Sequence, residues 1–255
     1  MLAKQRRQKI LDLLEEEGSA RVKALSETFN VSEPTIRQDL EKLEADNHIT
    51  REHGGAQIKD FSTKVRSLSL HHMVNMDKKA AIGVKAAEFI EERDSIVLDS
   101  GSTTTEIAKN ILEKKNITVV TNSLNIALLL GSNPSITVIV TGGEFKAPTL
   151  SLTGEKAAEF FEQIHISKLF LAVGAVSISG GLTFPGFNDI NVKRAMINSA
   201  EKIYLVADSQ KIGKTMLAPL CDVEKVDAFI VDQDIKPEDK AAFEAKGIEV
   251  IVAEA

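Results

Sequence analysis

The 255-residue sequence predicts an α/β protein in two parts, a small helical domain over residues 1–57 and a larger domain over residues 77–255. In the first part, apolar residues follow helical spacing between dense charges. In the second part, short β-branched runs alternate with amphipathic stretches, which is typical of a doubly wound, mostly parallel sheet covered on both faces. Residues 58–76 fit neither pattern, so we expect a linker there.

Three helices and a hairpin are expected in the first part. Helix 1 ends at Gly18, a second short helix covers residues 21–29, and Ser32 caps a third helix over residues 33–46. The segments HITR and AQI then flank a Gly54-Gly55 turn, which predicts a β-hairpin. The residues expected to face the core of this part are Ile10, Leu13, Leu14, Val22, Leu25, Phe29, Ile36, Leu40 and Leu43.

A short turn between the second and third helices predicts a helix-turn-helix. Such a motif places the N-terminal residues of its second helix against base edges, where arginine suits guanine and glutamine suits adenine. We expect the hairpin to act as a wing that carries Arg51 and His53 toward phosphates. The competing interpretation is a three-helix bundle for dimerisation, because residues 1–56 carry a net charge of −2.

The second part is expected to contain seven strands separated by helices. The strands are expected at residues 95–99, 117–121, 136–141, 168–173, 202–207, 226–231 and 248–252. The helices are expected at residues 78–91, 103–115, 123–131, 155–163, 189–200 and 237–246.

Several of these strands end in glycines, small hydroxyls or amides. Parallel sheets bind ligands beyond the carboxyl ends of their strands, so these residues predict a ligand site. The SGSTTT loop opens a helix whose N-terminus favours an anion. It lacks the lysine of a Walker A loop, so nucleotide hydrolysis is not implied. Lys79 and Lys211 are candidate cations for a phosphate, and Asp208 could orient Lys211 or accept sugar hydroxyls.

Composition excludes several classes of protein. Hydrophobic residues make up 43% and charged residues 27%, which is ordinary globular usage. The single cysteine, Cys221, rules out an intrachain disulfide and argues against a cysteine-based zinc site. No signal-peptide core or membrane-length apolar run is visible, so we expect a cytoplasmic protein without a metal or cofactor. With a net charge of −6, any contact with nucleic acid has to be local.

The stretch VSEPTIRQDLEKLE, followed by REHGGA, resembles the N-terminal signature of DeoR-type bacterial transcriptional regulators. The segments LDSGSTTTEIA, VVTNSLNIA, VTGGEF, SLTGEKA, LTFPGFNDINVKRAMI and ADSQKIGK are similar to the sensor domain of that family. The resemblance implies a winged helix-turn-helix, a sensor fold like ribose-5-phosphate isomerases and CoA transferases, and a phosphorylated sugar effector. Three departures are visible: Gln38 replaces a usual arginine, Asn47 replaces a usual glycine, and Gln210 replaces the serine before the last lysine.

Together, the pattern and the resemblance assign two sets of residues. Those expected to bind double-stranded operator DNA are Arg6, Arg21, Ser32, Pro34, Thr35, Arg37, Gln38, Arg51 and His53. Those expected to bind the effector are Lys79, Asp99, Gly101, Ser102, Thr103, Thr104, Asn122, Gly142, Gly143, Asp208 and Lys211.

The leading hypothesis is a repressor of sugar-metabolism genes that works as a homo-oligomer, either a dimer or a tetramer. The alternative is an enzyme like a sugar-phosphate isomerase with an added helical module. An isomerase needs a general base to take a proton from the sugar carbon, and Asp99 or Asp208 could serve. A pure oligomerisation module would leave the polar strand ends unexplained.

Overall fold

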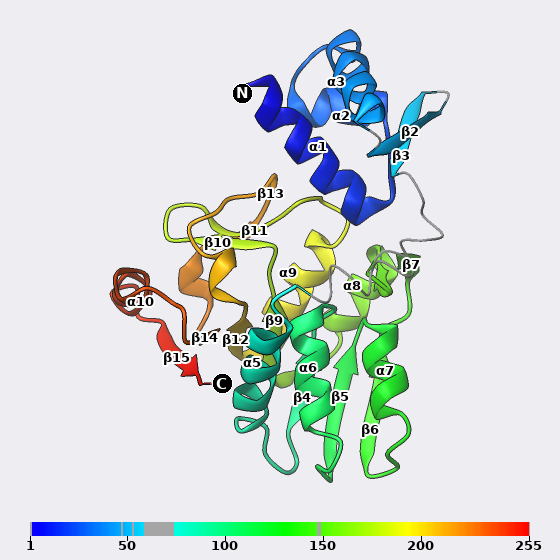
Figure 1. Cartoon of the computed structure of the whole chain (residues 1–255). Coiled ribbons are helices and arrows are strands. Elements are labelled where there is room, and N and C mark those ends of the chain that lie inside the picture. Colours follow the sequence, from blue (N-terminus) through cyan, green and yellow to red (C-terminus); the bar gives the residue numbers. More distant parts are fainter. Residues whose placement is uncertain (1, 47, 53, 59–73, 147–148, 255) are drawn as a thin grey trace. The chain divides into compact units, whose positions relative to one another are not determined.

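The structure of the chain is a computed structural model that describes residues 2–46, 48–52, 54–58, 74–146 and 149–254. Two compact units, Met1–His71 and His72–Ala255, make up the chain (Figure 1). Most of the expected linker at residues 58–76 lies outside the described residues. Its first residue belongs to a strand of the first unit and its last residue to a helix of the second.

The first unit is a three-helix core with a small antiparallel sheet, which confirms the three expected helices and the hairpin. The helices are α1 (Ala3–Glu17), α2 (Val22–Phe29) and α3 (Glu33–Ala45). The strands β1 (Ser19–Arg21), β2 (Ile49–Glu52) and β3 (Gly55–Ile58) pair in the order β1-β3-β2. All nine apolar residues that were expected to face the core are buried.

Local signals set the ends of these helices. Gly18 follows α1 with a φ of 79°, and Asn30 follows α2 in the left-handed region, with a φ of 50°. The Ser32 hydroxyl caps α3 by accepting a hydrogen bond from the Thr35 backbone N–H at 3.4 Å. Strand β1 was not expected, because three residues beside a helix end show no period. It runs so close to β3 that a Cβ on Gly55 would lie 2.5 Å from the Ala20 carbonyl oxygen.

The second unit is built on a seven-stranded sheet whose neighbouring strands are all parallel. Its strand order is β15-β14-β12-β9-β4-β5-β6, and all seven expected strands are present. Their bounds are β4 (Ser95–Leu98), β5 (Ile117–Thr121), β6 (Ile136–Val140), β9 (Ile166–Ala172), β12 (Ala200–Val206), β14 (Ala228–Asp232) and β15 (Glu249–Ala253).

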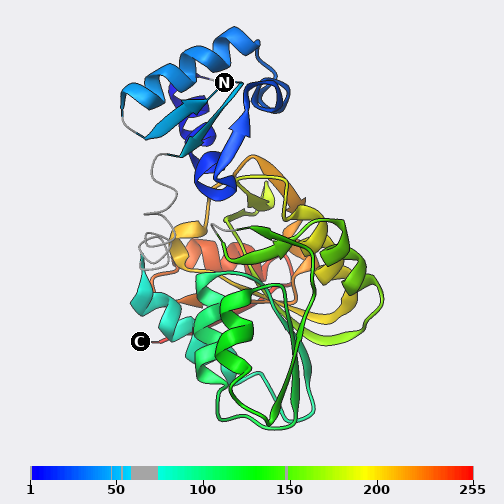
Figure 2. The same cartoon turned by 90° about the vertical axis from the view of Figure 1, so that its right-hand side faces the viewer.

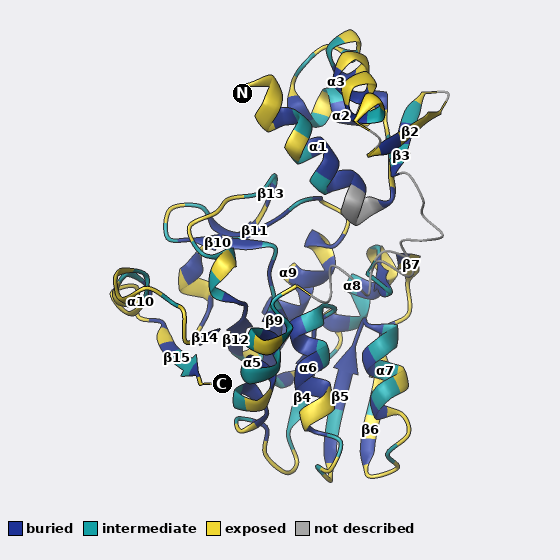
Figure 3. Cartoon of the chain, in the orientation of Figure 1, coloured by how far each residue is buried: buried dark blue, intermediate teal, exposed yellow. Residues whose placement is uncertain are grey.

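Helices cover both faces of this sheet, as Figure 2 shows, so the doubly wound class is confirmed. The helices are α5 (Met76–Ala87), α6 (Ser102–Asn110), α7 (Leu124–Leu130), α8 (Glu155–Glu162), α9 (Ile190–Ser199) and α10 (Pro237–Glu244). On one face, α5, α6 and α7 bury Ile82, Ile107 and Ile126. On the other face, α8, α9 and α10 bury Phe161, Met196 and Phe243. Figure 3 shows buried residues along the strands of the sheet and in helices beside it. Successive strand residues alternate between these two clusters.

Two features of the second unit differ from the expectation. Helix α6 ends at Asn110 rather than near residue 115, and the Asn133 side chain donates to the Leu112 carbonyl oxygen at 2.6 Å just beyond it. Short antiparallel strands also appear beside the main sheet. They are β7 (Glu144–Lys146), β8 (Ser151–Thr153), β10 (Ala175–Ser177), β11 (Gly181–Phe184) and β13 (Ala218–Cys221). Within the described residues, no helix has the length and apolar character needed to cross a membrane.

Candidate functional sites

The third helix of the first unit presents a polar outer face. Arg37 and Gln38 are exposed, whereas Ile36 and Leu40 on the opposite face are buried. Arg37 pairs with Glu33 one turn earlier at 3.2 Å, with both side chains about half exposed. An exposed pair of this kind contributes little stability, so the Arg37 guanidinium can change partners at small cost.

The other residues expected to contact DNA differ in their exposure and in whether their polar groups are already hydrogen-bonded. Pro34 and Arg21 are exposed. The hydroxyls of Ser32 and Thr35 lie 2.9 Å apart and hydrogen-bond to each other, so both also serve the helix start. His53 lies outside the described residues.

Arg6 is a correction to the DNA-binding set. Its side chain is 10% exposed, and its Nε lies 2.5 Å from Asp39 Oδ2, on a carboxylate that is itself buried. Arg7 reaches the other oxygen of Asp39 at 3.4 Å. The two arginines therefore fasten α1 to α3 instead of presenting Arg6 to a phosphate. From the sequence alone, a charged residue such as Arg6 is expected at the surface. No local pattern shows that its partner, Asp39, lies in another helix.

The wing is joined to α3 through Arg51. Its Nε lies 2.8 Å from a Glu44 carboxylate oxygen, and one of its terminal nitrogens lies 3.0 Å from a Glu41 carboxylate oxygen. The Arg51 backbone N–H also donates to Glu44 at 3.0 Å. Sequence reasoning assigned Arg51 a phosphate and missed both carboxylates. In this structure the guanidinium links the hairpin to the outer face of the third helix.

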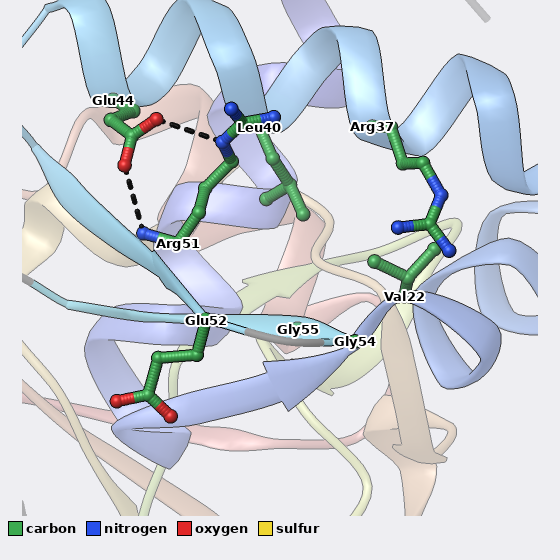
Figure 4. A pocket seen from close by; sticks show the side chains of 8 residues that line it. All are labelled: Val22, Arg37, Leu40, Glu44, Arg51, Glu52, Gly54 and Gly55. Carbon is green, nitrogen blue, oxygen red and sulfur yellow. Dashed lines mark hydrogen bonds and ion pairs between the residues drawn. The ribbon is translucent and has the colours of Figure 1, made fainter.

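A hollow of about 380 Å³ separates the third helix from the wing (Figure 4). Figure 4 shows the Arg37 side chain extending from α3 at one end of this hollow, and Arg51 hydrogen-bonded to Glu44 at the opposite end. The residues that line it are Val22, Arg37, Leu40, Glu44, Arg51, Glu52, Gly54 and Gly55. Both expected cationic contacts of this region thus border one concave surface.

In the second unit, polar residues gather at the carboxyl ends of four adjacent strands, β12, β9, β4 and β5. The Ser100 backbone N–H, beyond β4, donates to the Asn122 side chain beyond β5 at 3.1 Å and to Asp99 at 2.8 Å. The Ala172 N–H, at the end of β9, donates to Asp99 at 3.2 Å. The sheet therefore brings Asp99 and Asn122 together.

Asp99 is fully buried and is held by a lysine that sequence reasoning missed. Lys193 of α9 places its Nζ 2.5 Å from Asp99 Oδ2, and both side chains are almost inaccessible. Burial raises the pKa of Asp99, and the Lys193 ammonium partly opposes that rise. The Asp99 carboxylate is thus occupied by three protein donors. This corrects the assignment of Asp99 as a direct effector ligand. A lysine at i+3 from Ile190 and i−3 from Met196 on a buried helical face was the signal available in the sequence.

A second buried pair lies close to the first. Lys146 of β7 contacts Asp189 at 2.9 Å, and the Asp189 charge also acts on Asp99. Three buried side-chain oxygens have no hydrogen-bond partner among the described residues, namely Ser123 Oγ, Asn125 Oδ1 and Asp189 Oδ1. An unsatisfied buried polar atom costs about 1–3 kcal/mol, so a bound polar molecule would relieve that cost if it reached them.

Asp208 and Lys211 both act electrostatically on Lys79. Lys79 is 6% exposed, and burial lowers its pKa, while Asp208 opposes this shift and Lys211 adds to it. Asp208 accepts hydrogen bonds from the Asn75 side chain at 3.0 Å and from the Gln210 N–H at 3.2 Å. Among the described residues, neither Lys79 nor Lys211 forms a direct ion pair.

The neighbouring Lys78 behaves differently from Lys79. Its Nζ lies 3.0 Å from Asp232 and 2.7 Å from Asp234, and it also donates to the Ser209 hydroxyl. Asp232 is buried and accepts from the Ser209 N–H at 2.6 Å. Lys78 therefore joins α5 to the ends of β12 and β14, whereas the adjacent Lys79 has no such partner within the described part of the chain.

The SGSTTT loop precedes α6, but its residues have different roles. A Cβ on Gly101 would lie 2.9 Å from the Ala172 Cβ, so this glycine allows close packing against β9. Thr104 is fully buried and donates its hydroxyl to the Gly101 carbonyl oxygen at 3.0 Å. In this structure the Thr104 hydroxyl proton is therefore used within the loop, and a role of Thr104 toward the effector stays a prediction. Ser102 is half-buried and Thr103 is 6% exposed.

The two glycines after β6 also differ. Gly142 has a φ of 72° and open space around it. Gly143 has a φ of 113°, and a Cβ there would lie 2.5 Å from the Thr153 carbonyl oxygen. A side chain at Gly143 would thus meet the end of β8, whereas Gly142 is free of neighbours.

Comparison with known proteins agrees with this architecture. Residues 6–61 match the DeoR-like helix-turn-helix domain, and residues 74–233 match the DeoR C terminal sensor domain. The chain is 34% identical over 251 residues to the uncharacterized HTH-type transcriptional regulator YulB of Bacillus subtilis (strain 168), covering 98% of this chain and 96% of that protein. It is 31% identical to the HTH-type transcriptional regulator GlpR of Haloferax volcanii, covering 98% of each.

A further relative is the glycerol-3-phosphate regulon repressor of Escherichia coli (strain K12), which is 29% identical and covers 89% of this chain and 90% of that protein. Among solved structures, ribose 5 phosphate isomerase A from Neisseria gonorrhoeae aligns over 52% of each chain with 20% identity and a TM-score of 0.39. That partial likeness supports no functional conclusion. The two family matches and the relatives that align along nearly the whole chain support one conclusion: the chain belongs to the DeoR family of DNA-binding transcriptional regulators.

Proposed function

We propose that this regulator represses genes of sugar metabolism and that a phosphorylated sugar releases it from its operator. The observation that carries the proposal is Lys79, a buried lysine without an ion pair among the described residues. Two carboxylates act on it from a distance, and the first of these, Asp208, already accepts two hydrogen bonds, while the second, Glu106, pairs with Lys109. A second ammonium, Lys211, acts on Lys79 as a like charge. Two cations that repel each other favour a shared anion such as a phosphate.

Further polar groups of the second unit could bind the hydroxyl groups of a sugar. Asn122 and Ser102 lie at neighbouring strand ends, and Gly142 leaves open space at the next one. The Ser123 hydroxyl oxygen is buried and without a partner among the described residues. In this proposal the phosphate is bound by Lys79 and Lys211, and the sugar hydroxyls are bound by the amide and hydroxyl groups. The buried pairs of Asp99 and Asp189 with their lysines hold the strand ends in place.

The names of the relatives point the same way. GlpR of Haloferax volcanii is named a transcriptional regulator, and the Escherichia coli relative is named the repressor of the glycerol-3-phosphate regulon. On the DNA side, we assign base contacts to Arg37 and Gln38 and phosphate contacts to Arg21 and Arg51. We expect a regulator of this kind to act in the cytoplasm, where the chromosome is.

A ligand screen tests the proposal. Phosphorylated and unphosphorylated sugars are compared by thermal shift, and a true effector at a hundred times its Kd should stabilise the protein by about 2.7 kcal/mol. The same compounds are then added to an operator complex followed by fluorescence anisotropy. Release by a phosphorylated sugar alone supports the proposal, and no response to any of them contradicts it. Isomerase turnover on the same panel would favour the enzymatic alternative.

A further inference from the structure

Strand β6 is an edge of the large sheet, and it lacks the features that normally protect an edge. Among the described residues it pairs with β5 alone (Figure 1). Natural edge strands carry charges, prolines or bulges that prevent pairing with another chain. The sequence of β6 is ITVIV, which contains none of these. The opposite edge, β15, begins with the exposed Glu249.

The stretch of sequence that contains β6 is also free of charge. Residues 116–143, which include β5, α7 and β6, contain no Asp, Glu, Lys or Arg, although 27% of the chain is charged. Several apolar side chains in this stretch are exposed, namely Leu128 at 81%, Val140 at 38% and Ile139 at 36%. A neutral apolar surface on a protein with a net charge of −6 is where two identical chains meet without repulsion.

The hydrogen bonds to β5 show which backbone groups of β6 face outward. The Asn116 N–H donates to the Ser135 carbonyl oxygen, and the Thr141 N–H donates to the Thr121 carbonyl oxygen. Odd-numbered residues of this segment therefore turn their backbone groups toward β5, and even-numbered ones turn theirs to the free edge. The residues whose N–H and C=O groups face outward are Ile136, Val138 and Val140.

We infer that β6 pairs antiparallel with β6 of a second copy of this chain, about a two-fold axis at Val138. In this register Ile136 faces Val140 of the second copy and Val138 faces its own equivalent, so all outward groups are matched. Thr137 and Ile139 then form close cross-strand pairs whose side chains lie on one face of the joined sheet. A two-fold contact brings each residue to a fixed counterpart, and every counterpart here is uncharged.

Charge substitutions at the exposed positions Thr137 and Ile139 test this register in the full-length protein. The double variant Thr137→Glu, Ile139→Glu places like charges opposite each other, and the dimer Kd should rise about tenfold or more. The matched variant Thr137→Lys, Ile139→Glu places opposite charges in the same pairs, and its Kd should stay within about threefold of the wild type. Sedimentation equilibrium measures both, and circular dichroism checks that each variant is folded.

A cysteine substitution checks the axis directly. Val138→Cys, in a chain whose native thiol is removed by Cys221→Ser, should give a disulfide-linked dimer, since facing Cα atoms in a hydrogen-bonded pair lie about 5.5 Å apart. Ile251→Cys on the other edge strand is the matched control and should stay monomeric on a non-reducing gel. A monomeric wild type, equal Kd values for the two charge variants, or equal cross-linking of the two cysteine variants would overturn the inference. None of these readouts depends on the sugar ligand, so the two proposals fail separately.

Discussion

Lys193 and Asp99 form a buried ion pair that joins α9 to the end of β4, with Nζ 2.5 Å from Oδ2. The same ammonium lies 4.8 Å from the centre of the Phe184 ring. Because both charges are removed from water, neither is stable without the other. The pair therefore determines where the loop after β4 lies and, through it, the position of Ser100 and Gly101 in the candidate site.

Lys193→Met should lower the free energy of unfolding by about 3–5 kcal/mol, because it leaves the Asp99 carboxylate buried and unpaired. Adding Asp99→Asn should recover most of that loss. Chemical denaturation of the single and double variants measures both effects. If the double variant is as unstable as Lys193→Met, packing and not charge explains the loss.

The loss of stability caused by Lys193→Met should depend on pH in a defined direction. Burial raises the pKa of Asp99 in the folded protein, and losing Lys193 should raise it further. A carboxylate with a raised folded-state pKa favours folding below its unfolded pKa of about 3.9 and loses that contribution as pH rises through the folded value. The destabilisation of Lys193→Met should therefore shrink below about pH 4 and be complete above the raised pKa. Equal destabilisation at every pH that both proteins tolerate would exclude this cause.

Arg37→Ala should weaken operator binding by about 1–3 kcal/mol and leave folding intact, since within the described residues its side chain pairs only with the half-exposed Glu33. Anisotropy titration at fixed salt measures the change, with a random duplex as the control. Unchanged operator affinity would contradict the placement of α3 in the major groove.

Arg51→Ala should weaken binding to specific and nonspecific DNA alike, because we propose that Arg51 contacts a backbone phosphate. The slope of log affinity against log salt concentration should become shallower by about one unit. Glu44→Gln removes a carboxylate that now holds Arg51 at 2.8 Å, so it should strengthen nonspecific binding. A loss confined to the operator would mean that Arg51 acts on the bases or through α3.

Lys211→Ala should bind the operator normally but fail to respond to the effector, as an uninducible repressor does. Lys79→Ala should give the same defect in weaker form. The reason is that a ligand shifts an equilibrium only through its different affinities for the two states. The response is measured as operator binding with and without the sugar phosphate. Lys214→Ala, at an exposed position, is the matched control. A normal response by Lys211→Ala would remove this lysine from the phosphate site.

Cys221 should react slowly with thiol reagents. Burial raises the pKa of its thiol to about 11, against about 8.5 for a free cysteine. At pH 8 the thiolate fraction is then roughly two-hundredfold smaller than in a free thiol, and labelling should slow by a similar factor. Unfolding in denaturant should restore the rate. Fast labelling of the folded protein would show that the thiol is accessible and ionised.

The sequence by itself determined the elements with a clear period and the class of the protein. Apolar spacing fixed α1, α2 and α3, and continuous β-branched runs fixed the strands of the large sheet, because burial of one face or of both faces leaves a local pattern. The polar strand ends predicted a candidate ligand site, since parallel strands end at one edge.

Tertiary structure alone decided which charges are buried and which strands pair over long distances. Arg6 and Asp39 lie in different helices, and Lys193 is 94 positions from Asp99 in the sequence, so no local pattern predicts that these charges neutralise each other. The short strands β1, β7, β8, β10, β11 and β13 have three or four residues each, too few to show a period. Pairing and burial depend on partners that only the folded chain brings together, because each is stabilised by contacts between segments remote in sequence.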